Sequence, residues 1–377
     1  MFRFKPVLVC LLVSLVFFNP VAGQQFFPVD GLRDVVFDDG RQLLYVTTSR
    51  GTVERLDIEA LAMLEPWSVG QNLQGVDITE DGNFIYVCDR VDLGDQSVIH
   101  KIDLQSGKLE ELFYQQKSEG GSFDIVILKN NQAFTAGTSG RVPLRELDLL
   151  TDSFTIRNDV PGNDGLIWDR PLFVRGVGRN SFFKLTTDLS SGPVFQYDQA
   201  TNSFSEELGV GGFIEEAGAV DRTGQLLAAE ERLLDNEISL VDLIPYNSRA
   251  YAFDPLRNLL YVADENSDEI IAYDYVRLLE FARFPIGADF EEGQLHISSD
   301  SRHLFLTSDD DGVFYYTNPL RFLLGDVNRD GEVNLLDVFA FVDLLINEEF
   351  QEEADINRDG QLDLLDVDPF IDLLASD

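Results

Sequence analysis

Residues 31–318 alternate between short apolar runs, rich in Val, Ile, Tyr and Phe, and turn sequences such as Asp-Gly. Alternation of this kind predicts β-strands, and two runs joined by a tight turn predict a hairpin. Seven segments with this pattern follow one another, and an apolar stretch and a turn precede each. They cover 43–58, 84–104, 132–149, 181–199, 226–243, 259–275 and 303–319. The pattern predicts a tandem array of small antiparallel sheets.

The segments repeat with a period of about 45 residues. Six of them end in a hydrophobic residue followed by an Asp anchor. The anchors are Asp57, Asp103, Asp148, Asp198, Asp242 and Asp274. Units of three or four strands are typical of propeller blades, so we expect an all-β, seven-bladed β-propeller. The last two anchors are only 32 residues apart, which predicts a blade without a full outer strand and leaves the blade count open by one.

Two stretches, Tyr45-Val46-Thr47-Thr48 and Tyr261-Val262-Ala263-Asp264, resemble the strands of the YVTN and lactonase-like propeller family, whose architecture is WD40-like. This resemblance covers about 31–318 and implies a fold. It does not imply an activity, because propellers serve as hydrolases, lyases and binding platforms alike.

The seventh unit ends near Thr317 with three predicted strands. A propeller avoids exposed strand edges when one blade is completed from both ends of the chain. The extended segment Phe26-Phe27-Pro28-Val29 is available for this purpose. We therefore expect it to supply the outer strand of the last blade.

The N-terminus has the order of a secretory signal peptide. Arg3 and Lys5 precede an apolar stretch from Val7 to Phe18, and the small residues Val21-Ala22-Gly23 follow. The apolar stretch is short for a membrane span, although an N-terminal anchor is the alternative. After removal of 1–23, Cys88 is the one remaining cysteine, so an intrachain disulfide is excluded. We expect a secreted or cell-surface protein without a membrane span in its mature form.

The chain holds 67 acidic and 28 basic residues, a net charge of −39. Such a surplus argues against nucleic acid and anionic membranes as partners. It suits calcium or a cationic ligand, and it also serves solubility outside the cell.

Two twelve-residue segments, 326–337 and 355–366, place oxygen-bearing side chains at positions 1, 3, 5, 9 and 12 and Gly at position 6. This spacing is that of a calcium-binding loop, in which the residue at position 7 contributes its carbonyl oxygen. The expected ligands of two Ca²⁺ ions are Asp326, Asn328, Asp330, Glu332, Asn334, Asp337, Asp355, Asn357, Asp359, Gln361, Asp363 and Asp366. A single match could be chance, but two matches 29 residues apart, with 13 identities in 20 aligned positions, are not.

One predicted helix follows each loop, at 335–346 and 364–374, and Asp replaces the Glu usual at position 12. Duplicated loop-plus-one-helix units resemble the type I dockerin over 326–374. The resemblance implies an all-α, EF-hand-like calcium domain whose partner is a cohesin domain of another protein. Loop positions 10 and 11, which help to choose that partner, are Leu335-Leu336 and Leu364-Leu365 here, unlike the hydroxylic residues frequent in cellulosomal members. We expect a signal peptide at 1–23, the propeller at 24–320, a linker at 321–325 and the dockerin-like domain at 326–377.

Residues spaced by three and four on each predicted helix share one face. The duplicated stripe that we expect in the core consists of Val338, Phe341, Leu345, Val367, Phe370 and Leu374. The expected contact surface is the neighbouring face, which includes Leu336, Asp343, Leu365 and Asp372.

Catalytic residues are not recognisable from the sequence. His100, His296 and His303 lack a metal-ligand spacing, and the last two lie in predicted strands, where a structural role is expected. The remaining candidates are acidic inter-strand loops, which hold Asp89 to Asp95, Asp188, Glu230-Glu231, Asp264-Glu265 and Asp309-Asp310-Asp311. The long connection 158–171 carries Trp168, which would either contact a sugar or peptide at a rim or plug a blade junction.

These observations favour a secreted calcium-binding protein. Its propeller would recognise an extracellular ligand or polysaccharide, and its dockerin-like domain would attach it to a cohesin-type partner or cell-surface assembly. The alternative is a tethered propeller hydrolase of the lactonase-like kind, acting in polysaccharide catabolism. A metal in the central channel would favour the enzyme, whereas a channel lined by scattered apolar residues would favour the binding protein.

Overall fold

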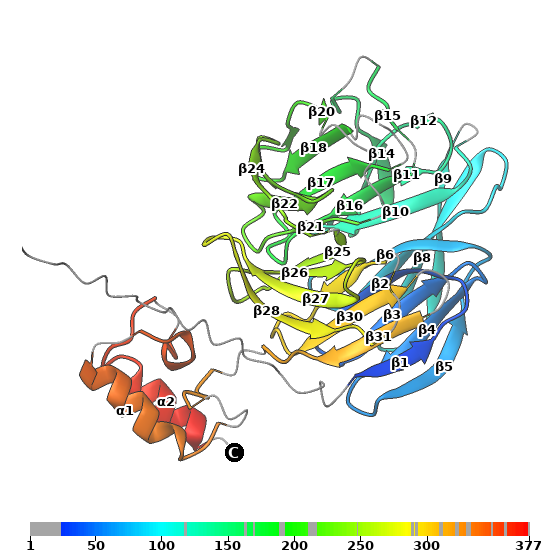
Figure 1. Cartoon of the computed structure of the whole chain (residues 1–377). Helices are drawn as coiled ribbons and strands as arrows, with labels where there is room; N and C mark the ends of the chain where they lie inside the picture. Colours follow the sequence, from blue (N-terminus) through cyan, green and yellow to red (C-terminus); the bar gives the residue numbers. More distant parts are fainter. Residues whose placement is uncertain are drawn as a thin grey trace, which may run out of the picture.

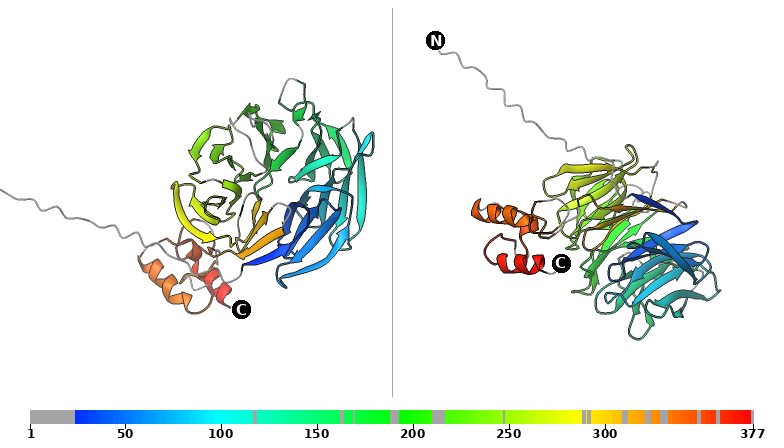
Figure 2. Two further views of the ribbon diagram at one scale, coloured as in Figure 1. Left: turned by 45° about the vertical axis from the view of Figure 1, so that its right-hand side comes forward. Right: turned by 90° about the horizontal axis from the view of Figure 1, so that it is seen from below.

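The computed structural model describes residues 24–375, apart from short gaps. The gaps are at 117–118, 162–163, 169, 188–192, 210–216, 247, 288–289, 291–292, 309–311, 321–323, 329–332, 348–349 and 358–359. The strands form seven antiparallel sheets around a central axis, followed by helices at the C-terminal end (Figures 1 and 2). The proposed signal peptide at 1–23 lies outside the described residues.

The first four blades follow the expected repeat, and in each blade the strands run in chain order from the central axis outwards. Blade 1 is β2 (Leu32–Asp38), β3 (Leu43–Thr48), β4 (Thr52–Asp57) and β5 (Ala62–Ser68). Blade 2 is β6 (Leu73–Ile78), β7 (Phe84–Asp89), β8 (Gln96–Asp103) and β9 (Leu109–Gln115). Blade 3 is β10 (Ser122–Ile127), β11 (Gln132–Gly137), β13 (Arg145–Asp148) and β14 (Ser153–Ile156). Blade 4 is β16 (Pro171–Val174), β17 (Ser181–Thr186), β18 (Pro193–Asp198) and β19 (Ser203–Phe204), with β20 (Leu208–Gly209) also paired to β18.

The remaining blades complete the ring. Blade 5 is β21 (Ala219–Val220), β22 (Leu226–Ala229), β23 (Arg232–Asp235) and β24 (Leu240–Leu243). Blade 6 is β25 (Ser248–Phe253), β26 (Leu259–Asp264), β27 (Glu269–Asp274) and β28 (Leu279–Pro285). Blade 7 is β29 (Leu295–Ile297), β30 (His303–Ser308), β31 (Gly312–Thr317) and β1 (Gln25–Pro28). A separate small ladder joins β12 (Arg141–Val142) to β15 (Ile167–Trp168). The prediction of a seven-bladed β-propeller is confirmed.

The core of the propeller lies between the blades. Its buried apolar residues form seven clusters, and each cluster joins two consecutive blades. The cluster between blades 7 and 1 contains Phe305 and Val313 on one side and Leu44 and Val46 on the other. Because strand residues alternate between the two faces of a sheet, each blade buries both faces, one against each neighbour.

The N-terminal strand closes the ring as predicted. β1 runs antiparallel to β31, with Gln25 opposite Tyr315 and Pro28 opposite Gly312. Phe26 packs on Phe314 with 4.7 Å between ring centroids, and Phe27 enters the cluster between blades 7 and 1. This pairing supplies the fourth strand of the last blade without a disulfide.

The predicted anchor in blade 5 was wrong. Asp242 lies inside the outer strand β24, whereas Asp235 ends the third strand and pairs with Leu226 as the other anchors pair with the second strand. The strands of blade 5 have four residues or fewer, so the whole blade fits into a shorter stretch of sequence. The outer strand that the 32-residue spacing predicted to be incomplete is that of blade 5; it is present as β24, which contains Asp242 and pairs with β23.

The C-terminal region contains α1 (Asp337–Asn347), the short 3₁₀ helix η1 (Glu352–Ala354) and α2 (Val367–Leu374). The two α-helices match the predicted segments 335–346 and 364–374 to within three residues at each end. None of the described helices has the length and apolar content that a membrane span requires.

Candidate functional site

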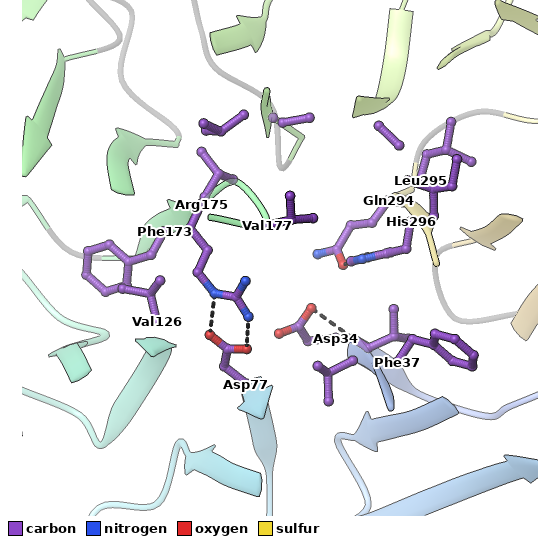
Figure 3. A pocket seen from close by; sticks show the side chains of 18 of the residues that line it. Asp34, Phe37, Asp77, Val126, Phe173, Arg175, Val177, Gln294, Leu295 and His296 are labelled. Carbon is purple, nitrogen blue, oxygen red and sulfur yellow. Dashed lines mark hydrogen bonds and ion pairs between the residues drawn. The ribbon is translucent and has the colours of Figure 1, made fainter. Parts of the chain in front are cut away.

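The inner strands of the propeller enclose a cavity of about 360 Å³, which we call the channel cavity (Figure 3). One part of its wall is polar and the opposite part is apolar. The polar side chains are Asp34, Asp39, Asp77, Asp124, Arg175, Arg179, Tyr251, Gln294, His296 and Ser299. The apolar side chains that blades 4 to 6 contribute include Leu172, Val174, Ala217, Ala219 and Ala252. A volume of this size is at the lower end of the range for small-molecule sites.

Asp34 and Asp124 occupy the same place in blades 1 and 3, just before the inner-strand residues that pair with Val46 and Thr135. Each carboxylate accepts one N–H from the next residue of its own strand, at 2.8 and 2.7 Å. Its second oxygen accepts an N–H from the inner strand of the following blade, from Val76 or Phe173, at 2.7 Å in both cases. The two carboxylates therefore join neighbouring blades while they line the cavity.

Asp77 accepts the same two kinds of backbone N–H, from Ile78 at 2.8 Å and Ile127 at 2.7 Å, but it also has cationic partners. Arg175 binds both carboxylate oxygens, at 2.9 and 2.6 Å, and Arg179 lies 4.0 Å away. Although burial acts in the opposite direction, these two guanidinium groups hold the pKa of Asp77 below its usual value. Asp77 is therefore a compensated anion.

The other titratable groups of the cavity are shifted by burial. Burial raises the pKa of Asp34 to about 7, against the opposing backbone hydrogen bonds. Burial and the charge of Asp34 raise the pKa of Asp124 well above its usual value. Burial lowers the pKa of His296 to about 4, so the imidazole is neutral at physiological pH, and its Nε2 lies 3.2 Å from Oε1 of Gln294.

The acidic loops named from the sequence do not form the site. Asp89 is buried away from the cavity, where it accepts N–H groups of Gln71 and Asn72 and lies 3.1 Å from Nε2 of His100. In the described part of the chain, none of the carboxylates of these named loops lines the channel cavity, whereas Asp39, in the turn after β2, does. Asp188 and Asp309-Asp310-Asp311 lie outside the described residues.

For His296 and His303 the sequence predicts a structural role, and for Trp168 it leaves open whether the side chain lines a functional site or plugs a blade junction. His303 begins β30, and its Nδ1 is 3.0 Å from the Tyr315 hydroxyl, as expected for a structural residue. His296 lies in a strand as predicted, but it faces the cavity. Trp168 is 36% exposed beside the Arg141 guanidinium, so it does not plug a blade junction.

The sequence contained an indication of the cavity outside the acidic loops. Asp77 lies between the buried Val76 and Ile78 in the innermost strand β6, and Asp34 directly precedes the buried Val35 in β2. A carboxylate in such a strand is costly unless it lines a cavity or has bound partners. Charged residues inside the innermost strand of the repeat were therefore the informative positions.

The second candidate site is the duplicated loop pair at the C-terminal end. Asp337, the first residue of α1, accepts the N–H groups of Asn328 and Asn334, both at 2.9 Å. Asp366, which stands at the N-cap of α2, accepts the N–H groups of Asn357 and Asp363, both at 3.0 Å. In each loop the residue at position 12 thus fixes positions 3 and 9 from the start of a helix.

The remaining loop positions fit the calcium pattern where the structure describes them. Gly360, at position 6 of the second loop, has φ +85°, a conformation that favours glycine and that the sharp turn requires. Its N–H donates to Oδ2 of Asp355, which is buried like Asp326, its counterpart at position 1 of the first loop. Buried carboxylates gathered around a tight turn are the donor set that Ca²⁺ prefers. Asp330, Glu332 and Asp359 lie outside the described residues.

The stripe expected in the core of this region is confirmed. Phe341 of α1 stacks on Phe370 of α2, with 4.2 Å between ring centroids and an interplanar angle of 19°. Val338, Leu345, Val367 and Leu374 pack around them, together with Leu362, which stands at position 8 of the second loop.

The exposed faces of the two helices differ, although their cores are duplicated. Along α1 and the turn directly before it, exposed apolar residues at spacings of four, three and four form one stripe, which we call the α1 stripe. It consists of Leu335, Phe339, Val342 and Ile346, and Phe339 is 83% exposed. The equivalent positions 29 residues later are Leu364, Asp368, Ile371 and Ala375. The second helix thus carries a charge where the first carries its largest exposed apolar side chain.

Solved structures with the same fold share little sequence with this chain. Hydrazine synthase of Kuenenia stuttgartiensis is 12% identical, with a TM-score of 0.58 over 77% of this chain and 96% of that one. The β-propeller domain of Cps50 (Swd1) from Myceliophteria thermophila is 13% identical, with a TM-score of 0.59 over 78% and 99%. The Dos1 propeller is 15% identical, with a TM-score of 0.58 over 76% and 78%. At this level of identity the similarity shows the fold alone.

A comparison with curated protein sequences found no match. The family model of the dockerin type I domain matches residues 324–374. This match covers both loops, α1 and α2, and domains of this type bind calcium and imply attachment to a cohesin. The chain therefore carries a type I dockerin domain after a seven-bladed β-propeller.

Proposed function

We propose that this protein is secreted, with 1–23 as its signal peptide, and that it works as a calcium-dependent binding protein. Its propeller, at 24–320, recognises an extracellular ligand, and a linker at 321–325 leads to the dockerin domain at 326–377. That domain attaches the propeller to a cohesin-bearing partner or cell-surface assembly. The dockerin match to 324–374 is the observation that carries this proposal.

Two calcium ions hold the dockerin domain in its binding form. The proposed ligands are the twelve loop residues at positions 1, 3, 5, 7, 9 and 12 of 326–337 and 355–366, with position 7 contributing its carbonyl oxygen. The buried Asp326, Asp337, Asp355 and Asp366 support this assignment, since buried carboxylates are stabilised by a bound cation. The geometry around Gly360 supports it as well.

The partner docks mainly on α1. Its exposed stripe presents Phe339 beside Leu335, Val342 and Ile346, and large apolar residues of this kind are typical anchors of protein interfaces. The predicted contact residues Leu336 and Leu365 are exposed too, at 65% and 67%. The 16 acidic residues among the 53 of 325–377 favour a partner surface that is apolar at its centre and basic at its rim.

The test is capture by cohesin. Mature protein (residues 24–377) is passed over an immobilised panel of cohesin domains with 2 mM CaCl₂ (roughly a saturating level for extracellular calcium sites) or with excess EGTA. Retention that EGTA abolishes supports the proposal. Retention of a chain that ends at residue 320 and so lacks the dockerin domain contradicts it, and so does retention that persists in EGTA.

A further inference from the structure

The channel cavity contains two inner-strand carboxylates that are bound by backbone groups and not by cations, besides the exposed Asp39, which accepts an N–H from Ser299. Asp34 and Asp124 each accept two backbone N–H groups, one per oxygen. Within the described residues, neither makes an ion pair. A carboxylate oxygen has two lone pairs, so each of these oxygens keeps capacity for a further donor. Both side chains line the cavity and are therefore available to a ligand that enters it.

The cationic side chains of the cavity are committed to other groups. Arg175 makes its two-point ion pair with Asp77, and Arg179 donates to the carbonyl oxygens of Ile78 and Ile127 at 2.8 and 3.0 Å. Figure 3 shows the Arg175 guanidinium directed to Asp77, with the Asp34 carboxylate beside them in the open part of the cavity. Once the Asp34 and Asp124 carboxyls have lost their protons, the uncompensated charge in the cavity is therefore negative, and a bound cation would favour this ionised form.

Gly75 of blade 2 packs closely against the Asp124 carboxylate. It occupies in blade 2 the position that Asp34 and Asp124 occupy in blades 1 and 3, directly before Val76. A Cβ atom at Gly75 would lie 2.2 Å from Oδ1 of Asp124, so any larger residue would collide with that carboxylate. Glycine at this position therefore lets the Asp124 side chain lie close to blade 2, while both Asp34 and Asp124 still line the cavity.

The other walls indicate what the rest of the ligand looks like. Gln294 and His296 extend toward the cavity on one side of Asp34 (Figure 3), and the neutral imidazole offers a hydrogen bond without a charge. Beyond the polar groups, the wall from blades 4 to 6 is built of Leu172, Val174, Ala217, Ala219 and Ala252. Small apolar residues leave space for an apolar body and give it a surface to pack on.

We propose that the channel cavity binds a small organic cation, an alkyl- or arylammonium, with its nitrogen between Asp34 and Asp124 and its apolar body on the wall of blades 4 to 6. This deepens the proposed function and rests on its premise that the propeller recognises a ligand. The net charge of −39 would concentrate such cations around the molecule. An ammonium with an apolar body uses both the carboxylates and the apolar wall of this cavity, whereas a bare metal ion would use only the carboxylates.

The experiment is calorimetric titration of the mature chain at pH 8, with calcium present to keep the dockerin domain loaded. The probes are benzylamine, 1,4-diaminobutane and tetramethylammonium. Benzyl alcohol and benzoate are the control compounds, because they resemble benzylamine but are neutral and anionic, respectively. We expect at least one of the cations to bind and the two control compounds to show no heat of binding. The double variant Asp34→Asn with Asp124→Asn should weaken that binding at least tenfold.

Asp254→Asn is the matched control. Asp254 is buried and accepts backbone N–H groups of Leu256 and Arg257, as the two channel carboxylates do with their own partners, but it does not line the cavity. This variant should bind the cation like the parent protein, and a thermal melt of each variant verifies that the propeller is folded.

Three results would overturn the inference: benzoate binding in place of benzylamine, cation binding that the double variant leaves unchanged, or no binding of any of the three cations. Each is distinguishable from failure of the proposed function. Cohesin capture is measured on a different domain, and a propeller that bound a neutral saccharide would keep the proposed function while excluding an ammonium ligand.

Discussion

The propeller and the dockerin domain of this chain are stabilised in opposite ways. The propeller has seven apolar clusters, one at each junction between blades, and its last sheet is completed by the N-terminal strand. The dockerin domain has one small cluster around Phe341 and Phe370, and exposes its remaining large apolar side chains. A closed ring can depend on burial alone, whereas a small two-helix domain needs a further source of stability.

The largest effect that we expect is that of calcium removal, which should unfold one region and leave the other folded. Chelation should unfold the dockerin domain, because the clustered carboxylates of its loops repel one another without a cation and its core is small. The propeller should keep its structure. Circular dichroism and calorimetry with and without EGTA will report loss of the helical signal and an unchanged main melting transition. Helix content that survives EGTA would contradict the comparison.

The variants Asp337→Ala and Asp366→Ala test the same point residue by residue. Each removes a carboxylate that fixes positions 3 and 9 of its loop. Together they should abolish calcium binding, measured by titration calorimetry, and single variants should each remove one ion. Two ions bound to the double variant would exclude these residues as ligands.

The next largest effect that we expect is a loss of cohesin affinity when α1 is made to resemble α2. Phe339→Asp places in the first helix the residue found at the equivalent position 368 of the second. It should weaken cohesin binding about tenfold or more, as loss of an exposed aromatic anchor does. Because Phe339 is 83% exposed, the melting temperature should barely change.

Ile371→Asp is the control for that variant, since it changes an exposed apolar residue of α2. If the partner docks on α1, this variant should keep most of the affinity in surface plasmon resonance. Equal losses for the two variants would mean that both helices are used alike.

Deletion of 24–30 should have a smaller effect, on the propeller alone. It removes β1, which exposes the edge of β31 and takes Phe27 and Val29 out of the cluster between blades 7 and 1. We expect the melting temperature of the propeller to fall by several degrees, while calcium binding is unchanged. A melt identical to that of the mature chain would show that ring closure is not needed for stability.

The smallest expected effect is on the pH dependence of the propeller. The pKa of Asp34 is raised from 3.8 to about 7 in the folded state, so the folded protein binds this proton more tightly than the unfolded chain does. Stability from this group is therefore present at low pH and is lost as the pH rises toward 7. Asp124 acts in the same direction, Asp77 in the opposite one, and His296, whose pKa is lowered, opposes Asp34 between pH 4 and 6.

Asp34→Asn should thus flatten the fall in melting temperature between pH 5 and pH 8, by about 1–2 °C. The slope is the measured quantity, because the amide also changes the hydrogen bonds to Val35 and Val76 at every pH. A slope equal to that of the parent protein would mean that Asp34 does not titrate in this range.

Much of the fold could be predicted because the same strand or loop pattern occurs several times in the chain. Seven similar strand patterns, or two similar loops, are informative where a single pattern is ambiguous. The closure by Phe26 and Phe27 followed from counting strands. Blade 5 was the exception, since Asp242 has the same local sequence as a true anchor and lies one strand later.

The channel cavity could not be predicted from loops because inner strands build it. Asp34, Asp77 and Asp124 come from three blades, and only the ring closure brings them to one axis with Arg175. The α1 stripe escaped prediction for another reason. Duplication of the helices suggested two equal faces, and the difference between Phe339 and Asp368 became meaningful once their exposure was known.

The pairing of β1 with β31 also sets an order of events during synthesis. β1 is made before the other strands of the ring, and its partner is made after all the inner strands. Until β31 is formed, Phe26 and Phe27 belong to a short extended segment with no place in a sheet. An unpaired extended segment can pair with the wrong strand or with another chain. The blades between β1 and β31 must therefore assemble while β1 is still unpaired. The ring therefore closes last, at blade 7. The dockerin domain follows blade 7 in the chain, so every strand of the propeller has been synthesised before the domain that binds the partner.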